Sequence, residues 1–350
     1  MSEHWDPAGF KDRVDTLLAG FLAAEAEQLL AIDDALHPLA EQLRSAAAHG
    51  KRLRAAFCYW GWRAAGQPDS DALVRAAASM ELVHAAAIVH DDLIDDSPLR
   101  HNRPTAHVAL QTALAGLPQA RAAARSLAML VGDHLMALAG LLFTTSGLPA
   151  AYLARARPMW ATLARELIAG ECLEILATGT QPDTDVSLKV VRYKTAKYTV
   201  EQPLLIGALL AGATPRLRAG LSAYGLPLGE AFQLRDDLLG LFGEPERTGK
   251  AGLDDIRTHR PTALLATAWQ TALPAQRERL AGVLGRRDLT DAHLRDVREL
   301  MTALKAPEQV ENMIASRVQE AVSRLNELHM PNPARRALTD LARSATDRHH

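Results

Sequence analysis

The sequence predicts an all-α protein: a single-domain bundle of about ten or more helices around a deep central cavity. Hydrophobic residues make up 48% of the 350 residues, and Ala and Leu dominate over alternating β-branched residues, which favours helix over strand. Gly followed closely by Pro recurs between the apolar segments, as at Gly66 and Gly147. This pattern is a common signal for the end of a helix. We find no sheet-forming hairpin signals in the sequence.

The helices are expected in long segments separated by these breaks. In chain order the segments cover residues 6–35, 37–48, 53–65, 70–95, 105–115, 119–146, 149–178, 185–213 and 215–242, with several shorter helices over 261–345. A single domain over residues 1–350 is favoured, because acidic motifs at Asp91 and Asp236, far apart in the chain, are expected to meet at one site.

Charge, cysteine content and hydropathy narrow the class of protein. The formal net charge of −2 gives no reason to expect a nucleic-acid partner. Cys58 and Cys172 lie in apolar helical segments, and we expect both to be buried free thiols in a reducing compartment. The most apolar run, residues 127–143, is interrupted by Asp133 and His134, and the N-terminus is too polar for a signal peptide. We therefore expect a cytoplasmic protein without a transmembrane segment.

A cluster of carboxylates ends the helix expected over residues 70–95. Asp91 and Asp95 are four residues apart, so they share one helix face about one 5.4 Å turn apart, with Asp92 beside them. Two carboxylates this close repel each other unless a cation lies between them. Oxygen ligands at this spacing suit Mg²⁺, which completes its coordination shell with water and substrate phosphates.

A second acidic pair, Asp236 and Asp237, ends another apolar helical segment in the run FQLRDDLLG. One such motif is weak support for a metal site, because acidic groups near helix ends are common and usually solvated. Two motifs, each after a long apolar segment and each followed by basic residues, indicate opposed helix ends that share metal ions. The predicted metal ligands are Asp91, Asp92, Asp95, Asp236 and Asp237.

Four motifs resemble, in the same order, those of trans-isoprenyl diphosphate synthases, the prenyltransferase family that includes farnesyl and geranylgeranyl diphosphate synthases. They are GKRLR at 50–54, ELVHAAAIVHDDLIDD at 81–96, RYKTAKYTVEQPLLIGALLAG at 192–212 and FQLRDDLLGLFGEPERTGK at 232–250. The resemblance spans residues 50–262 and implies the class I isoprenoid synthase fold. It also implies a homodimeric trans-prenyltransferase that uses about three Mg²⁺ ions per site to condense isopentenyl diphosphate with an allylic diphosphate.

The resemblance implies roles for individual residues. Asp91 and Asp95 would hold two metal ions and Asp236 the third. The residues that match the allylic diphosphate ligands of the family are Arg100, Lys194, Thr195, Gln233, Lys250 and, where Lys is usual, Arg260. The residues that match its isopentenyl diphosphate ligands are Lys51, Arg54, His84 and, by position, His101. The catalytic group is expected to be Asp91, Asp95, Asp236, Lys194 and Arg100.

Two positions depart from the family pattern. His101 stands where the second Arg of an RRGxPT motif is usual, and a neutral imidazole cannot offer a bidentate fork to phosphate. Either His101 is protonated beside the diphosphate, or Arg103 reaches into the site, or the isopentenyl diphosphate site is weakened or altered. Gly240 replaces the last Asp of the second motif, where the first Asp is the main metal ligand in relatives.

The residues that precede Asp91 on its helix predict the product length. Ala87 and Ala86, four and five positions earlier, are small and let a growing chain pass. Val83 and Met80 lie deeper, and Met80 is bulky enough to stop the chain. At about 1.5 Å of rise per residue, Met80 lies roughly 16 Å below Asp91, which fits about four isoprene units. The expected product is therefore geranylgeranyl diphosphate.

Each of these features has a simpler interpretation when it is taken alone. Lys51 and Arg54 alone would more often be a solvated helix start, His84 a hydrogen-bonded core histidine and Met80 a core filler. Their joint occurrence with the acidic motifs favours one site for diphosphate and metal.

Two other functions stay open from the sequence. A class I terpene cyclase on the same fold also uses two metal-binding helices, but it has no use for isopentenyl diphosphate. Retention of Lys51, Arg54 and His84 argues against a cyclase, while His101 keeps that alternative open. A non-catalytic partner subunit of a prenyl diphosphate synthase is the other alternative, and the intact acidic motifs argue against it.

Overall fold

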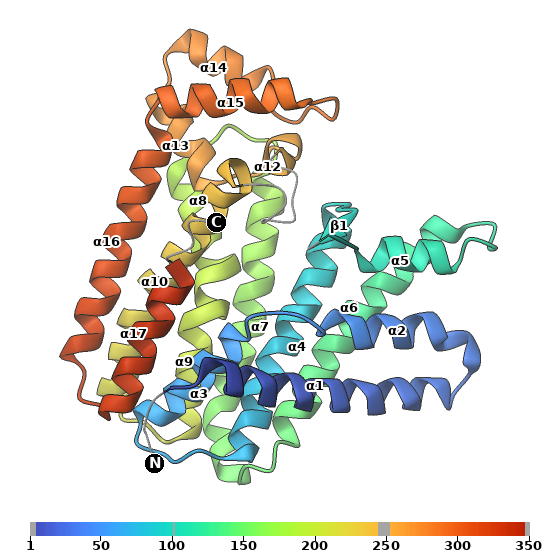
Figure 1. Ribbon diagram of the computed structural model, residues 1–350, viewed down its shortest axis with the longest axis vertical. Coiled ribbons are helices and arrows are strands. Elements are labelled where there is room, and N and C mark those ends of the chain that lie inside the picture. Colours follow the sequence, from blue (N-terminus) through green and yellow to red (C-terminus); the bar gives the residue numbers. More distant parts are fainter. Residues whose placement is uncertain (1–4, 101, 244–252, 347–350) are drawn as a thin grey trace.

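The structure is a computed structural model that describes residues 5–100, 102–243 and 253–346. The predicted ligands His101 and Lys250 lie outside the described residues. Helices make up nearly all of the described chain (Figure 1), and more than ten of them are present there. The prediction of an all-α bundle is confirmed.

The elements follow one another in this order: α1 (Pro7–Leu30), η1 (Asp34–Leu36), α2 (His37–Ala46), α3 (Leu53–Ala64), α4 (Asp71–Ile94), β1 (Leu99–Arg100), β2 (Arg103–Pro104), α5 (Ala106–Ala113), α6 (Ala120–Thr144), α7 (Ala150–Ala177), α8 (Thr184–Val190), η2 (Val191–Glu201), α9 (Gln202–Leu210), α10 (Pro215–Phe242), α12 (Asp254–Arg257), α13 (Ala263–Thr271), α14 (Pro274–Ala281), α15 (Asp291–Ala303), α16 (Ala306–Glu327) and α17 (Asn332–Thr346).

Capping residues fix the start of several helices. The carboxylate of Asp6 accepts a hydrogen bond from the Gly9 N–H at 3.0 Å, and Pro7 occupies the first turn of α1. Asp183 accepts one from the Val186 N–H at 2.9 Å at the start of α8. In each case the side chain satisfies an N–H group that has no partner inside the helix. Polar residues before apolar segments therefore set these boundaries.

The segment expected as one helix over residues 185–213 is divided into three parts. Its centre, η2, is a π-helix of 11 residues between the α-helices α8 and α9. A π-helix has wider turns than an α-helix and is frequent at functional sites. The apolar periodicity of this segment does not distinguish the two, so the expectation of a continuous α-helix was wrong here.

A short hairpin follows α4 and was not expected from the sequence. Leu99 of β1 pairs with Pro104 of β2, and Arg100 pairs with Arg103. Asn102, in the turn between them, has a left-handed backbone with φ of 61°, a conformation that Asn tolerates better than most residues. Strands of two residues are too short to leave an alternating pattern in the sequence.

Three clusters of buried residues form the core of the described chain, and the smallest consists of Leu110 of α5 with Ala124 and Ala128 of α6. The largest is formed by α1–α4, α6, α7, η2, α9, α10, the end of α16 and α17, and the second lies between the end of α10 and α12–α16. Figure 1 shows α14 and α15 lying across one end of the bundle, with the long α16 running along its side. Because α10 contributes to the two larger clusters, the two halves share one structural element, and the single domain stays a prediction that this sharing supports.

Two helices, α4 and α6, are long and apolar enough to cross a membrane by length and composition alone. Of the apolar stretch in α4, 72% is buried inside the protein, against 44% in α6. Burial of this kind is ordinary for the central helix of a bundle, and the apolar character of α4 is explained by the helices around it. The half-exposed α6 leaves apolar surface that its neighbours in the chain do not cover.

Candidate active site

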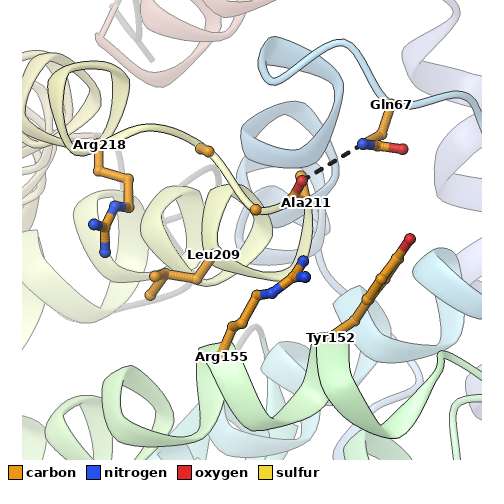
Figure 2. A pocket seen from close by; sticks show the side chains of 8 residues that line it. Gln67, Tyr152, Arg155, Leu209, Ala211 and Arg218 are labelled. Carbon is orange, nitrogen blue, oxygen red and sulfur yellow. Dashed lines mark hydrogen bonds between the residues drawn. The ribbon is translucent and has the colours of Figure 1, made fainter.

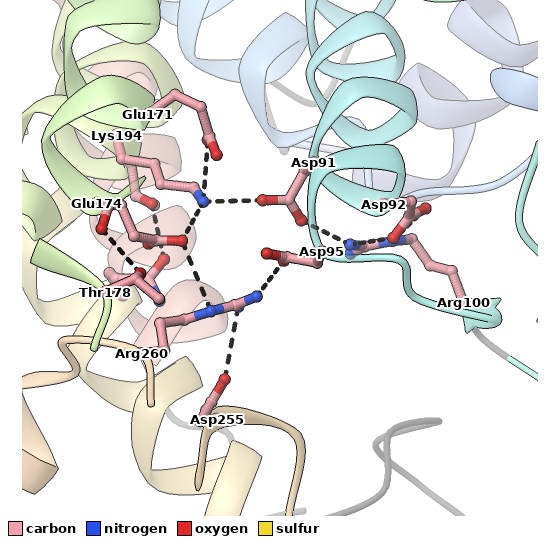
Figure 3. A network of polar contacts seen from close by, with 12 residues as sticks. Asp91, Asp92, Asp95, Arg100, Glu171, Glu174, Thr178, Lys194, Asp255 and Arg260 are labelled. Carbon is pink, nitrogen blue, oxygen red and sulfur yellow. Dashed lines mark hydrogen bonds and ion pairs between the residues drawn. The ribbon is translucent and has the colours of Figure 1, made fainter. Parts of the chain in front are cut away.

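The carboxylates at the end of α4 lie at the centre of a dense network of ion pairs (Figure 3). One Asp91 oxygen lies 2.8 Å from Lys194 Nζ and the other lies 2.9 Å from Arg100 Nη2. Asp95 pairs with Arg260, which comes from the segment after α12. Lys194 and Arg260, each more than one hundred positions from Asp91 in the chain, are thereby brought together with Asp91, Asp95 and Arg100.

Two further carboxylates, Glu171 and Glu174 of α7, complete this network, and sequence reasoning missed both. Lys194 Nζ lies 2.9 Å from Glu171 and 2.7 Å from Glu174. Oxygens of Asp91, Glu171 and Glu174 all lie within 4.8 Å of one another. We call these three residues the carboxylate cluster. The only sequence signal was an i, i+3 pair of Glu on an otherwise apolar face, which is common on solvated helices.

Close backbone contacts place Lys194 beside the cluster. A Cβ atom at Gly170 of α7 would lie 2.3 Å from the backbone nitrogen of Lys194, and one at Gly229 of α10 would lie 2.5 Å from the Ala196 carbonyl oxygen. Side chains at these two positions would therefore force η2 away from both helices. The absence of a side chain lets η2 lie between α7 and α10, with Lys194 directed at the cluster.

Charge in this network is strongly stabilised. Burial works to raise the pKa of Asp91, but Lys194, Arg260 and Arg100 outweigh it and hold that pKa well below its usual range. Burial likewise works to lower the pKa of Lys194, and the three carboxylates around it raise that pKa far above its usual value. An ionised carboxylate facing permanent cations is a site prepared for further charged ligands.

The remaining carboxylates of this network behave differently. Burial raises the pKa of Asp95 in spite of the Arg260 guanidinium, and it also raises the pKa of Glu171 in spite of Lys194. Asp92 is buried and accepts two hydrogen bonds from Arg100 Nε, at 2.8 and 3.0 Å. It thereby holds the guanidinium of Arg100 against Asp91. As a metal ligand, Asp92 stays a prediction.

The second acidic motif lies on α10 and has a separate set of contacts. Thr195 donates a hydrogen bond from Oγ1 to Gln233 Oε1 at 2.7 Å, and Gln233 Nε2 donates to Asp237 at 2.8 Å. The other Asp237 oxygen accepts from the Ala263 N–H at 3.2 Å. Burial raises the pKa of Asp237 to about 7. Asp236 is half-buried on a different face of the helix, and its role as a metal ligand stays a prediction.

A third group of predicted residues meets at Tyr198 of η2. Arg54 Nη2 donates to the Tyr198 hydroxyl and to Thr199 Oγ1, both at 2.8 Å, and its guanidinium lies 4.4 Å from the centre of the Tyr198 ring. His84 Nδ1 lies 3.2 Å from the same hydroxyl. Burial, together with the Arg54, Arg100 and Arg52 cations, lowers the pKa of His84 well below its usual value, so His84 is neutral near pH 7.

The other residues predicted from the sequence take the following positions. Lys51, three positions before Arg54 in the chain, is exposed. Met80, Val83 and Ala86 are buried in the core of α4, and Ala87 is half-buried. The residues that line a growing chain stay a prediction, as does the deep central cavity. The space between the carboxylates holds the ammonium group of Lys194 and the guanidinium of Arg260 (Figure 3).

One expectation about the cysteines was wrong. Cys58 is buried, and burial raises the pKa of its thiol to about 12. Cys172, in contrast, is exposed on α7. It lies on the outer face of that helix with Ile168, Ile175 and Leu176, which are exposed as well. The apolar surroundings that suggested burial belong to a surface that the described chain leaves uncovered.

The fold and the site define a class of protein: an all-helical enzyme in which helix-borne carboxylates meet half-buried cations. Residues 37–301 match the family model described as polyprenyl synthetase. The chain belongs to this family, the trans-isoprenyl diphosphate synthases, which confirms the resemblance noted in the sequence. It is therefore an enzyme that transfers prenyl groups.

Individual relatives differ in the products that their names state. The chain is 33% identical over 308 residues to a (2E,6E)-farnesyl diphosphate synthase of Mycobacterium bovis, covering 85% of this chain and 80% of the relative. It is 29% identical to the octaprenyl diphosphate synthase of Escherichia coli, covering 95% of each. A crystal structure of geranylgeranyl pyrophosphate synthase from Corynebacterium glutamicum, complexed with isoprenyl diphosphate and magnesium, is 33% identical, with a TM-score of 0.93 over 98% of this chain and 99% of that one. Membership of the family therefore leaves the product length open.

Proposed function

We propose that this chain condenses isopentenyl diphosphate with an allylic diphosphate and gives geranylgeranyl diphosphate. The observation that carries the proposal is the carboxylate cluster of Asp91, Glu171 and Glu174 around Lys194, with Arg100 and Arg260 beside it. Carboxylates for metal ions and fixed cations for phosphate oxygens are what the departure of a diphosphate requires. The complex of the Corynebacterium glutamicum enzyme with isoprenyl diphosphate and magnesium supports the same ligands here.

Magnesium fits the donor set of the site. The carboxylate cluster offers oxygen atoms alone, from three residues whose ligand atoms lie within 4.8 Å of one another, and Mg²⁺ prefers oxygen ligands. We propose that Asp91 and Asp95 hold two ions and Asp236 a third, giving about three per site. Bound there, the ions would neutralise charge on the departing diphosphate. Asp92 and Asp237, both turned to protein partners, would serve to position Arg100 and Gln233.

The allylic diphosphate would be held by the cations and hydrogen-bond donors around the same point. These are Arg100, Lys194, Thr195, Gln233, Lys250 and Arg260, of which all but Lys250 lie in the described residues. The C–O bond to the allylic carbon breaks, and both of its electrons leave with the diphosphate. Lys194 and Arg260 keep their protons throughout, because the surrounding carboxylates raise the pKa of each. They therefore act as fixed positive charges.

Isopentenyl diphosphate would bind on the side of Arg54 and His84, with Lys51 and His101 completing the set. Its double bond attacks the allylic carbon to form the new C–C bond, and the resulting carbocation loses a proton to the released diphosphate to give the product. Arg54 is stacked on Tyr198 and bonded to Thr199, so its orientation is fixed before substrate arrives. A guanidinium group with a fixed orientation can bind the phosphate oxygens of the substrate in one defined position.

The product length is proposed from the level of the bulky residues below the carboxylates. Met80 on α4 is eleven positions before Asp91, and Trp160 on α7 is eleven positions before Glu171, so each lies roughly 16 Å below its carboxylate on nearly the same helix face. Trp160 stacks on Phe143 of α6, with ring centroids 4.5 Å apart. Bulky side chains at one level on two helices support a floor that stops a chain of about four isoprene units.

The length assignment is tested by the product spectrum of variants. Met80→Ala should lengthen the product, because it removes bulk at the floor, and Ala86→Phe should shorten it by adding bulk above the floor. Chromatography of the dephosphorylated prenyl alcohols measures both. Unchanged spectra in both variants would place the floor elsewhere.

We also propose a homodimer joined through the outer faces of α6 and α7. Large apolar side chains are exposed there, and they are Met129, Leu130 and Leu141 of α6 and Ile168, Ile175 and Leu176 of α7. Exposed apolar surface of this extent is typical of protein interfaces. Sedimentation velocity should give a dimer for the wild-type protein and a monomer for Ile168→Lys with Leu176→Lys, whereas a wild-type monomer would contradict the proposal.

The remaining expectations concern the setting of the enzyme. We propose a cytoplasmic protein that has no nucleic-acid partner and no transmembrane segment, as its balanced charge and the burial of α4 among other helices support.

One incubation tests the proposed function against its alternatives. Purified protein is given farnesyl diphosphate and Mg²⁺, with and without isopentenyl diphosphate, and the products are separated. Elongation that needs both substrates and stops when EDTA removes the metal is expected. A cyclic product from farnesyl diphosphate alone would indicate a terpene cyclase, and no product under any condition would indicate a non-catalytic subunit.

A further inference from the structure

A pocket of about 590 Å³ opens at the end of the bundle away from the carboxylate cluster. It lies between the start of α7, the turn that joins α9 to α10, and the first turn of α10 (Figure 2). The side chains that border it include Gln67, Tyr152, Arg155, Leu209 and Arg218. Arg155 and Glu171 stand on the same helix about 24 Å apart, at about 1.5 Å per residue. The pocket is therefore separate from the candidate active site.

The pocket carries positive charge without compensation. Two of its lining residues are arginines and none is acidic. Within the described residues, neither Arg155 nor Arg218 forms an ion pair, whereas Arg52, Arg100, Arg235 and Arg260 all do. A guanidinium group is charged at every physiological pH. Two such groups facing one hollow attract an anion.

Arg218 holds a hydrogen-bond donor that the protein leaves unused. Its Nε atom is buried and has no hydrogen-bond partner within the described chain. A buried donor without a partner is unfavourable, so an acceptor from a ligand would relieve this. Arg218 also stands in the first turn of α10, which contains no acidic residue.

Arg155 is exposed, and its guanidinium lies beside Tyr152 and Gly212. Its guanidinium lies 5.0 Å from the centre of the Tyr152 ring, an arrangement that orients the group and leaves its edge free for oxygen ligands. A Cβ atom at Gly212, where φ is +74°, would lie 2.9 Å from Arg155 Nη1. The glycine thus makes room for the arginine against the α9–α10 turn.

We propose that this pocket binds a phosphate or diphosphate group of a small molecule. A guanidinium fork matches the oxygens of such a group, and the two arginines reach it from separate helices. The group could come from inorganic diphosphate or from the head of a phosphorylated metabolite such as a prenyl diphosphate. The proposal does not rest on the proposed function, because it concerns binding alone.

Binding is measured by isothermal titration calorimetry in EDTA, with inorganic phosphate, inorganic pyrophosphate and isopentenyl diphosphate as probes. Arg155→Gln with Arg218→Gln should weaken binding of the preferred probe at least about tenfold, since two charge-assisted contacts are lost. The matched control is Arg157→Gln with Arg216→Gln, which removes two exposed arginines from the same helices outside the pocket. The control should bind within about twofold of the wild-type protein.

The identity of the tightest probe assigns the source of the group. Pyrophosphate binding tighter than isopentenyl diphosphate supports the inorganic anion, and the reverse supports a prenyl diphosphate head. Gln67→Glu places a carboxylate at the rim without altering either arginine, and it should weaken binding even if the double variant does not fold. Wild-type affinity in Gln67→Glu and in the folded pocket variant, or an equal loss in the matched control, would overturn the proposal.

Discussion

The two acidic motifs of this enzyme are alike in sequence and different in structure. On α4, Asp91 is ionised and lies between Lys194 and Arg100, and its pKa is held well below the usual range. On α10, Asp237 is buried against Gln233 and the Ala263 N–H, and its pKa is raised to about 7. Asp91 of the first motif is therefore surrounded by cations, whereas Asp237 of the second motif is bonded to neutral groups inside the protein.

This difference indicates that the two adjacent Asp residues of each motif have different roles, although they are identical in sequence. In the α4 motif, Asp91 and Asp95 face fixed cations, and Asp92 serves to hold Arg100. In the α10 motif, Asp237 orients Gln233, which in turn accepts a hydrogen bond from Thr195. We therefore expect a large effect on turnover when Asp236 is replaced and a small effect when Asp237 is replaced.

The largest effect is expected at the first motif. Asp91→Ala should lower kcat by several orders of magnitude, because it removes the carboxylate that links Lys194 and Arg100 and that we assign to the metal ions. Asp96→Ala is the matched control: Asp96 is exposed, pairs with Arg121 and Arg125, and should retain kcat within a few-fold. Steady-state rates with saturating substrates measure both, and a near-normal rate in Asp91→Ala would refute the metal assignment.

The second motif should split into a large and a small effect. Asp236→Ala is expected to lower turnover by several orders of magnitude as well, whereas Asp237→Asn should cost less than about tenfold, because a neutral side chain is close to what burial favours there. Kinetics of the two variants at pH 7 decide this. An equal loss of turnover in both variants would show that Asp236 and Asp237 act as a unit and would contradict their different roles.

An intermediate effect is expected from the residues that the sequence did not reveal. Glu174→Gln keeps the size of the side chain and removes one of the three carboxylates around Lys194. We expect kcat to fall by about ten- to a hundredfold, since two of the three charges remain. A variant with a wild-type rate would remove Glu174 from the carboxylate cluster as a functional unit.

The smallest effect concerns stability and pH. The folded pKa of Asp237, about 7, exceeds the ordinary value of 3.8, so the folded protein binds this proton more tightly than the unfolded chain does. The contribution of Asp237 to the free energy of unfolding is then full below pH 4 and declines as the pH rises towards 7, by on the order of 2–4 kcal/mol. Asp237→Asn lacks this decline.

Thermal unfolding in EDTA at pH 5 and pH 8 measures the decline. The Tm of Asp237→Asn, relative to that of the wild-type protein, should be higher at pH 8 than at pH 5. Because the amide also loses one acceptor for the Ala263 N–H, a constant offset at both pH values is expected in addition. A relative Tm that does not change with pH would contradict the raised pKa.

Much of this architecture could be predicted from the sequence, because the relevant signals are local. Gly and Pro breaks marked the helix boundaries, and the spacing of Asp91 and Asp95 placed them on one face. The meeting of Lys194 and Arg260 with that face was implied by the family motifs rather than by spacing.

The rest depended on tertiary contacts that leave weak local signals. In the sequence, Glu171 and Glu174 resemble an ordinary pair of solvated residues. Their place in the site depends on η2, which brings Lys194 into contact with both. The close packing of η2 against α7 and α10 at Gly170 and Gly229 is also a contact between segments far apart in the chain. The burial of Asp237 and the exposure of Cys172 likewise depend on which face each helix turns outward, which the apolar content of a segment does not determine.

Locating the metal ions tests most directly whether the two acidic helices act together. Crystals grown with Mn²⁺ in place of Mg²⁺ and with a non-hydrolysable allylic diphosphate analogue would reveal the ions by anomalous scattering. The expected result is ions bound by Asp91 and Asp95 on one side of the diphosphate and by Asp236 on the other, with Asp237 still bonded to Gln233. Ions bound by one motif alone, or at neither, would contradict the proposal that the two acidic helices act together on one leaving group.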